Sequence, residues 1–211
     1  EILAQSSLVE EMIAKACRAL VDRRADLLSE VMASERTIDV REVKIEEDCL
    51  KILALHQPVA VDLRRTATVL KINTELERIA DLAVNIAERT GPLCEHLEFD
   101  IPDKVERMST KATDMVHDAL DAFVDLDVAM AREVCRSDEE VDKLNRQVID
   151  ELYETMQSQP ESIEAALNVF SVSRHIERIA DCATNIAEDV IYLVEGEIAR
   201  HHAVEMKPHL M

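Results

Sequence analysis

The stretch ERIADLAVNIAE at residues 77–88 returns one hundred residues later as ERIADCATNIAE at residues 177–188. Only two positions differ between the copies, Leu82 against Cys182 and Val84 against Thr184. A duplication this close indicates a chain built from two related halves. Each copy carries a Glu and an Asp four residues apart, so one acid-bearing segment in each half is the first place to look for function.

Apolar residues around each copy follow the periodicity of a packed helix. They recur at alternating steps of three and four, the spacing of helices that pack at shallow angles. The same offset holds in both halves: Val69, Ile72, Leu76, Ile79, Ala83 and Ile86 in the first, and Val169, Val172, Ile176, Ile179, Ala183 and Ile186 in the second. Each repeated stretch is therefore predicted to lie on a long helix.

The composition predicts an all-α fold. Hydrophobic residues make up 47% of the 211 residues, yet aromatic residues make up only 2% and Trp is absent. A core of Leu, Ile, Val, Ala and Met suits interlocking helices better than β-sandwiches. Two glycines and five prolines leave little material for hairpin turns.

Prolines and glycines divide the chain into six predicted helices. Gly91 and Gly196 are expected just past the ends of the two repeat-bearing helices, where a left-handed residue is favoured. The predicted helices span residues 2–33, 35–56, 59–90, 101–134, 137–157 and 160–195. Short connections predict two tandem, pseudo-symmetric, antiparallel three-helix bundles. The first is assigned to residues 1–96, and the second to residues 97–211 with a short polar C-terminal tail.

The net charge limits the kinds of partner. A formal charge of −20 and a pI near 4.7 argue against nucleic acid, because phosphate contacts need a basic surface. The same charge disfavours docking on anionic lipid but suits cation binding, or simply a solvated acidic surface. No apolar run is long enough for a transmembrane span, and no signal peptide is evident. Most of the five scattered cysteines are expected to be buried thiols, which fits a reducing, cytoplasmic compartment.

Acidic residues form a pattern that the duplication repeats. Glu77 and Asp81 lie four residues apart, hence on one face of a helix, and Glu177 and Asp181 repeat them. The preceding predicted helix of each half has a matching pair. In the first half it is Glu35 and Asp39 with Glu42 one turn on; in the second it is Asp138 and Asp142 with Asn145 in the place of Glu42.

If neighbouring helices set these lines face to face, four carboxylates converge in each bundle. Hard oxygen ligands suit magnesium, manganese or iron ions, and a cation would remove the repulsion between paired acids. Asn85 and Asn185 continue the acidic lines, while Arg78 and Arg178 could neutralise or steer the acids. In a chain with 44 acidic residues, a solvated face is the alternative for any single pair.

Enzyme signatures are missing from the sequence. No Ser-His-Asp spacing, glycine-rich phosphate loop or nucleophile elbow is found. The Glu-x-x-His pairs of di-iron bundles are also absent. No catalytic residue is therefore predicted, and the chain opens at Glu1 rather than Met, which leaves open whether residues precede it.

Several segments resemble the PhoU family, which regulates phosphate transport in bacteria. HQPVAVDLR at residues 56–64 resembles the family's Q-P-x-A-x-D-L-R segment, and LERIAD at 76–81 resembles L-E-R-I-G-D. IERIAD at 176–181 and YLVEG at 192–196 extend the likeness over nearly the whole chain. Ala80 and Ala180 depart from the glycine that is frequent in the family.

The resemblance implies two three-helix bundles and a negative regulator of phosphate uptake and phosphate-starvation signalling. It also implies multinuclear metal clusters of iron, zinc, manganese or magnesium, held by Glu35, Asp39, Glu77 and Asp81 in one bundle and by Asp138, Asp142, Glu177 and Asp181 in the other. The implied partners are the transporter's PstB-type ATPase subunit, a PhoR-type sensor kinase and a second copy of the chain. These partners would recruit a cytoplasmic protein to the inner face of the membrane. The alternative is a metal-independent adaptor that uses its acidic helix faces.

Overall fold

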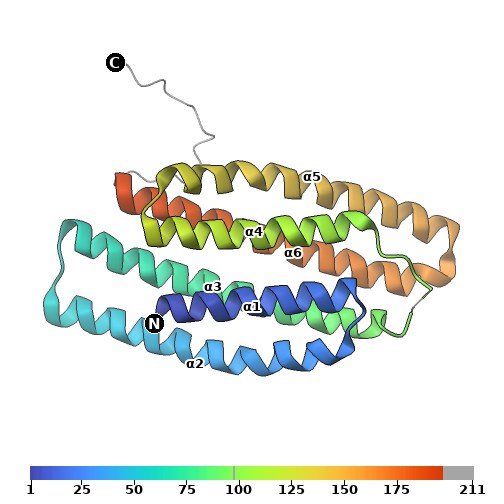
Figure 1. Cartoon of the computed structure of the whole chain (residues 1–211), viewed down its shortest axis with the longest axis horizontal. Helices are drawn as coiled ribbons and strands as arrows, with labels where there is room; N and C mark the ends of the chain where they lie inside the picture. The colour runs from blue at the N-terminus through green and yellow to red at the C-terminus, as the bar shows by residue number, and fades with distance from the viewer. Residues whose placement is uncertain (97, 197–211) are drawn as a thin grey trace, which may run out of the picture.

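The computed structural model describes residues 1–96 and 98–196. Successive long helices run antiparallel and form two sets of three, α1 to α3 and α4 to α6 (Figure 1). Their bounds are Ile2–Val21 (α1), Ala25–His56 (α2), Ala60–Leu93 (α3), Asp103–Asp125 (α4), Val128–Ser158 (α5) and Ile163–Glu195 (α6), with a 3-10 turn at Pro160–Ser162. The prediction of an all-α fold of two three-helix bundles is confirmed. The division into residues 1–96 and 97–211 stays a prediction.

The two repeat-bearing helices, α3 and α6, pack against each other along the middle of the molecule. The predicted apolar seam forms this core: Ile72, Ile79 and Ile86 on α3 are fully buried, and so are their counterparts on α6 to within 1%. One hydrophobic cluster runs from α1 through both central helices to α5. The halves are therefore joined by a shared core.

The first break between helices lies earlier than predicted. We predicted a break at residue 34, but α1 ends at Val21 and α2 already begins at Ala25. Arg23 makes the turn in a left-handed conformation with φ 54°. Its guanidinium donates to the carbonyl oxygens of Leu93, His96 and Phe99, so tertiary hydrogen bonds hold a conformation usually left to glycine.

The second break is also earlier than predicted, at residues 126–127 rather than 135–136. Leu126 ends α4 in a left-handed conformation with φ 56°. Asp127 then caps α5, and its Oδ1 accepts from the amides of Ala129 at 2.8 Å and Met130 at 3.0 Å. Asp is a preferred N-cap residue, so Asp127 indicates the start of α5, but our prediction of the helix bounds did not use it.

The two glycines behave differently from each other. As predicted, Gly196 ends α6 in a left-handed conformation, with φ 76°. Its amide donates to the carbonyl oxygen of Tyr192 at 2.9 Å. Gly91 is not a helix end, because α3 continues through Gly91 and Pro92 to Leu93. A proline so close to the helix end removes only one backbone hydrogen bond. The predicted C-terminal tail lies outside the described residues.

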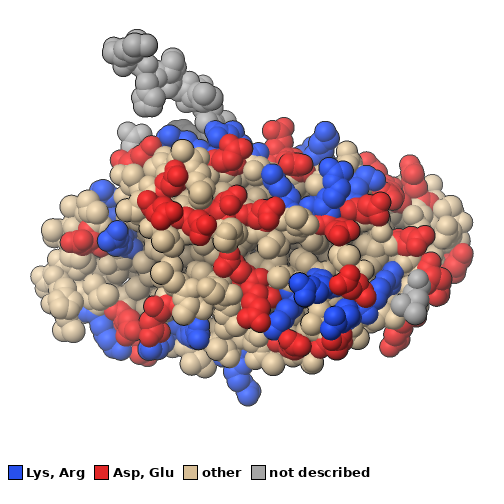
Figure 2. All heavy atoms as spheres, viewed as in Figure 1, with Lys and Arg blue, Asp and Glu red and all other residues tan. Residues whose placement is uncertain are grey.

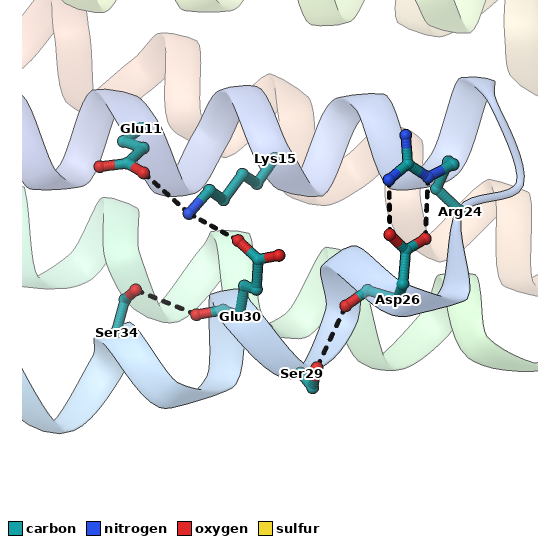
Figure 3. A network of polar contacts seen from close by, with 7 residues as sticks. All are labelled: Glu11, Lys15, Arg24, Asp26, Ser29, Glu30 and Ser34. Carbon is teal, nitrogen blue, oxygen red and sulfur yellow. Dashed lines mark hydrogen bonds and ion pairs between the residues drawn. The ribbon is translucent and has the colours of Figure 1, made fainter.

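Charged side chains of both signs cover the surface. Figure 2 shows groups of acidic side chains on one face, with Lys and Arg near them and uncharged residues between the groups. Figure 3 shows how such charges tie α1 to α2: Lys15 Nζ lies 2.7 Å from Glu11 and 2.9 Å from Glu30 on the next helix. Of the helices in the described ranges, none combines the length and hydrophobicity that a membrane crossing requires.

Candidate functional site: two facing acid clusters

The predicted acids of the first half lie on two adjacent antiparallel helices, α2 and α3. The amide of Asn73 on α3 donates to the backbone oxygen of Glu42 on α2 at 2.9 Å, which fixes the register of the pair. Counting along the antiparallel helices from this contact, Asp39 lies opposite Glu77, and Glu35 lies opposite Asp81. We call Glu35, Asp39, Glu42, Glu77 and Asp81 the first acid cluster.

In the first acid cluster, charges on each helix act on carboxyl groups of the other helix. Burial raises the pKa of Glu35, and the charges of Asp39 and of Asp81 across the helix pair raise it further. The pKa of Glu77 is raised by burial, then by Asp81 on its own helix and by Glu42 and Asp39 on α2. The acids of α2 and α3 therefore influence one another, and the convergence of four carboxylates stays a prediction.

The second acid cluster consists of Asp138 and Asp142 on α5 with Glu177 and Asp181 on α6. Burial and then the charges of Asp181 and Asp142 raise the pKa of Asp138 to about 6. The pKa of Glu177 is also raised, mainly by burial, although Arg174 opposes the rise through an ion pair of 2.9 Å. The carboxylates of the second acid cluster therefore repel one another, as those of the first cluster do.

Two carboxylate oxygens of the second acid cluster are shielded from solvent and have no hydrogen-bond partner. They are Asp138 Oδ1 and Glu177 Oε2. The amide oxygen of Asn145, one turn along α5 from Asp142, is buried and unpartnered too. Buried polar atoms usually have partners, so these oxygens fit a hard cation in their donor chemistry.

The side chains are not yet arranged around a cation. Within residues 1–96 and 98–196, no three His, Cys, Asp or Glu groups converge closely enough to hold a metal ion. The assignment of the eight acids as metal ligands stays a prediction.

Of the two arginines of the repeated stretch, Arg78 acts across the halves, whereas Arg178 acts within its own helix. Burial and then the charge of Asp142 raise the pKa of Asp181 on α6, and the charges of Arg174, of Arg78 on α3 and of Arg178 oppose this rise. The register explains the effect of Arg78, because Lys71 Nζ lies 2.7 Å from Asp189, and Asn185 donates to Glu75 at 3.3 Å. Arg78 therefore lies beside the acid of the opposite half.

The asparagines have structural roles in this arrangement. Asn85 donates to the backbone oxygen of Asp81 at 2.8 Å, one turn back along its own helix. Asn185 bonds Glu75 across the α3–α6 interface instead. Neither amide contacts a carboxylate of the two acid clusters.

Three further residues belong to the site but were not predicted. Glu88 adds its charge to the field at Glu35, and Arg174 pairs with Glu177. Cys135 lies near Asp138, whose charge contributes to raising the pKa of the thiol to about 11 after burial and Glu188. Glu88 ends the repeated stretch and Arg174 lies one turn before Glu177, so both were within reach of the sequence.

Comparisons with known proteins agree on one family. The PhoU domain family model matches residues 2–90 and 105–190. The phosphate-specific transport system accessory protein PhoU homolog of Deinococcus radiodurans is 39% identical over 188 residues, which cover 89% of this chain and 88% of the relative. The PhoU homolog of the same name from Pseudomonas aeruginosa is 38% identical to this chain over 203 residues, which cover 95% of this chain and 83% of the relative.

Solved structures show the same fold. The crystal structure of PhoU from Pseudomonas aeruginosa superposes with a TM-score of 0.89 at 38% identity and covers 93% of this chain and 94% of that chain. The phosphate transport system regulatory protein PhoU from Streptococcus pneumoniae gives 0.84 at 27% identity, with 93% of each chain covered.

Proposed function

Because this chain belongs to the PhoU family, we propose that it is a regulatory accessory protein of phosphate transport. It acts as a negative regulator of phosphate uptake and of phosphate-starvation signalling, and not as an enzyme. It works in the cytoplasm and reaches the inner face of the membrane through its partners. Those partners are the ATPase subunit of the phosphate transporter, a PhoR-type sensor kinase and a second copy of the chain.

The observation that carries the chemical part of the proposal is the repeated convergence of acid pairs. Burial and the charges of neighbouring acids raise the pKa of Glu35 and Glu77 in the first half and of Asp138 in the second. A cation held by these carboxylates supplies positive charge that removes their mutual repulsion. In the second acid cluster, the unpartnered oxygens of Asp138 and Glu177 favour this use.

Metal content tests the cation part directly. The wild type and the Glu77→Ala/Asp81→Ala and Glu177→Ala/Asp181→Ala variants are purified without chelator, then reconstituted with iron, zinc, manganese and magnesium. We expect the wild type to retain metal, and each double variant to lose the share bound by its own half. Wild type that stays metal-free, with unchanged thermal stability after reconstitution, would remove this part of the proposal.

Gene replacement tests the regulatory part. A strain lacking its own PhoU gene should express a phosphate-starvation reporter in phosphate-rich medium, and this chain should restore repression. Failure to repress, at normal protein levels, would contradict the assignment as a negative regulator.

A metal-independent adaptor is the second candidate, favoured by the exposure of Asp39, Asp81 and Asp181 at the cluster edges. In that case, charge reversal at the acid pairs should abolish binding to purified transporter ATPase or kinase, and chelators should have no effect. Binding that survives charge reversal would exclude this candidate.

A further inference from the structure

The interface between α3 and α6 has two ends, which the duplication makes equivalent (Figure 1). At one end, Lys71 Nζ on α3 lies 2.7 Å from Oδ1 of the buried Asp189 on α6. One turn further along α3, Glu75 accepts a hydrogen bond from Asn185 at 3.3 Å. Positive and negative groups of opposite helices meet here, so we call this the paired end.

The same register extends to the other end of the interface. Between the two contacts the residue number rises by four on α3 and falls by four on α6, as antiparallel helices require. Counting onward at this rate places Asn85 opposite His175 and Arg89 opposite Ser171. Arg178, three residues from His175, lies on the same face of α6. We call Arg89, His175 and Arg178 the cationic end.

The duplication reverses the charge between the two ends. An offset of one hundred residues relates Glu75 to His175 and Arg89 to Asp189. The two positions that are acidic at the paired end therefore carry a histidine and an arginine at the cationic end. The two helices pack against each other with either set, so the packing of the fold does not dictate this change.

The basic groups of the cationic end repel one another. Burial and then the charges of Arg178 and Arg89 hold the pKa of His175 below its ordinary value. Arg178 also acts on Asp181, one turn further along α6. Within residues 1–96 and 98–196, however, neither Arg89 nor Arg178 has a hydrogen bond or an ion pair. The protein itself supplies no anion that holds these two guanidinium groups.

A polar atom at the cationic end also lacks a partner. Nδ1 of His175 is shielded from solvent and has no hydrogen-bond partner. Buried polar atoms usually have one, and Nδ1 can carry the ring proton and donate it. Arg89 and Arg178 are exposed, so a ligand can reach this end from solvent. Negatively charged oxygen atoms are what the three groups together lack.

The chemistry of the donors favours a small oxyanion with several oxygen atoms. Guanidinium groups bind phosphate-like and carboxylate oxygens through paired N–H donors. The net charge of −20 repels an acidic macromolecule as a whole. A small ion feels mainly the charges within a Debye length of about 8 Å, and near the cationic end these include two arginines.

We propose that the cationic end of the α3–α6 interface binds a small divalent oxyanion of the phosphate or sulfate class through Arg89, Arg178 and Nδ1 of His175. The ion has the role that the carboxylate of Asp189 has at the paired end. The site uses none of the carboxylates of the two acid clusters. The proposal therefore depends neither on metal binding nor on the proposed role in phosphate transport.

Calorimetric titration of the whole chain with inorganic phosphate, and separately with sulfate, tests the site. Chelator is present throughout, so that an anion held by a bound metal ion is not counted. The wild type should bind one ion of either kind, and chloride at equal ionic strength should not replace it. Arg89→Gln and Arg178→Gln should each raise the dissociation constant by more than about tenfold.

A charge-swap variant and a matched control make the test specific. Arg89→Asp/His175→Glu gives the cationic end the acids of the paired end, and should abolish binding. Arg107→Gln removes the same charge from an exposed position on α4, and should change the dissociation constant by less than about twofold. Melting temperatures of all variants show that each is folded, and Arg89→Gln, at an exposed position, tests the site without the double substitution.

Nuclear magnetic resonance of the histidine rings locates the bound ion. Phosphate should shift the ring signals of His175 in the wild type but not in Arg89→Gln. The ring of His117 on α4, whose Nδ1 lies 2.7 Å from Glu10, should not respond.

Three results would overturn the proposal. One is a wild type that gives neither heat nor a shift of His175 with millimolar phosphate or sulfate. Another is a charge-swap variant that binds the ion as tightly as the wild type. The third is an equal loss of affinity in Arg107→Gln and Arg89→Gln, which would show a response to net charge alone.

Discussion

Lys71 on α3 lies with its Nζ 2.7 Å from Oδ1 of Asp189 on α6, and the Asp189 side chain is only 4% exposed. The same ammonium lies 5.2 Å from the centre of the Tyr192 ring. This ion pair joins residues 118 positions apart in the chain. It is a direct polar link between the two halves, at the interface that the repeated helices form.

Removing this lysine should destabilise the protein. Lys71→Met removes the ammonium group that pairs with the buried carboxylate of Asp189, and we expect the free energy of unfolding to fall by about 2 kcal/mol. Urea denaturation measures the change. Lys51→Met, which removes a pair of exposed surface contacts, should change it by less than about 0.5 kcal/mol. Equal effects of the two substitutions would show that burial of Asp189 carries no penalty.

The Arg23 turn separates the effects of hydrogen bonding and backbone conformation. Arg23→Ala loses the bonds to three carbonyl groups and keeps a left-handed residue with a Cβ, so it should destabilise by about 2–3 kcal/mol. Arg23→Gly loses the same bonds but relieves the conformational strain. It should be more stable than the alanine variant by about 1 kcal/mol. Thermal unfolding measures the stability of both variants. A more stable Arg23→Ala variant would contradict this expectation.

Asp138 should make the metal-free protein less stable at neutral pH than at mildly acidic pH. Its folded pKa of about 6 is above the ordinary value of 3.8, so the folded state binds the proton more tightly. Its contribution to stability therefore falls as pH rises from about 4 to about 6. Asp138→Asn should be more stable than wild type by about 1 kcal/mol at pH 7, after allowance for solvent screening.

The two proteins should converge in stability at about pH 3, below the ordinary value of 3.8, where the aspartic acid is neutral in both states. Denaturation at several pH values with chelator present measures this. Glu139→Gln, at the exposed neighbouring position, should show no comparable gain. A constant difference across the pH range would rule out titration of Asp138 as its cause.

Protons and cations should compete for the second acid cluster. We expect added manganese to raise the melting temperature more at pH 7.5 than at pH 5.5, because the carboxyl of Asp138 must lose its proton to bind a metal ion. The difference should vanish in Asp138→Asn/Asp181→Asn. A manganese effect that does not depend on pH would place the cation away from these carboxylates.

The fold was largely predictable because one periodic pattern occurs twice. The seam from Ile72 to Ile86, and its repeat from Val172 to Ile186, predicted both central helices and their burial. Helix ends were less predictable. The turns at Arg23 and Leu126 use left-handed residues other than glycine, which tertiary contacts hold in place and local propensity disfavours.

The spacing of the acids was predictable from the sequence, but their geometry was not, and their use as a site stays a prediction. Spacing of four residues places Glu77 beside Asp81 on any helix, and antiparallel pairing then brings Asp39 opposite them. Which acid is most perturbed depends on burial, and Asp138 could not be distinguished from Glu35 by spacing. The action of Arg78 on Asp181 depends on the α3–α6 register, which the sequence of one half does not contain.

That register has a consequence for how the two halves respond to each other. Arg78 follows Glu77 on α3, yet its charge acts on Asp181 of the other half. The field at the second acid cluster therefore depends on a side chain that the first half supplies. In this respect the two halves of the duplicated chain are one electrostatic unit.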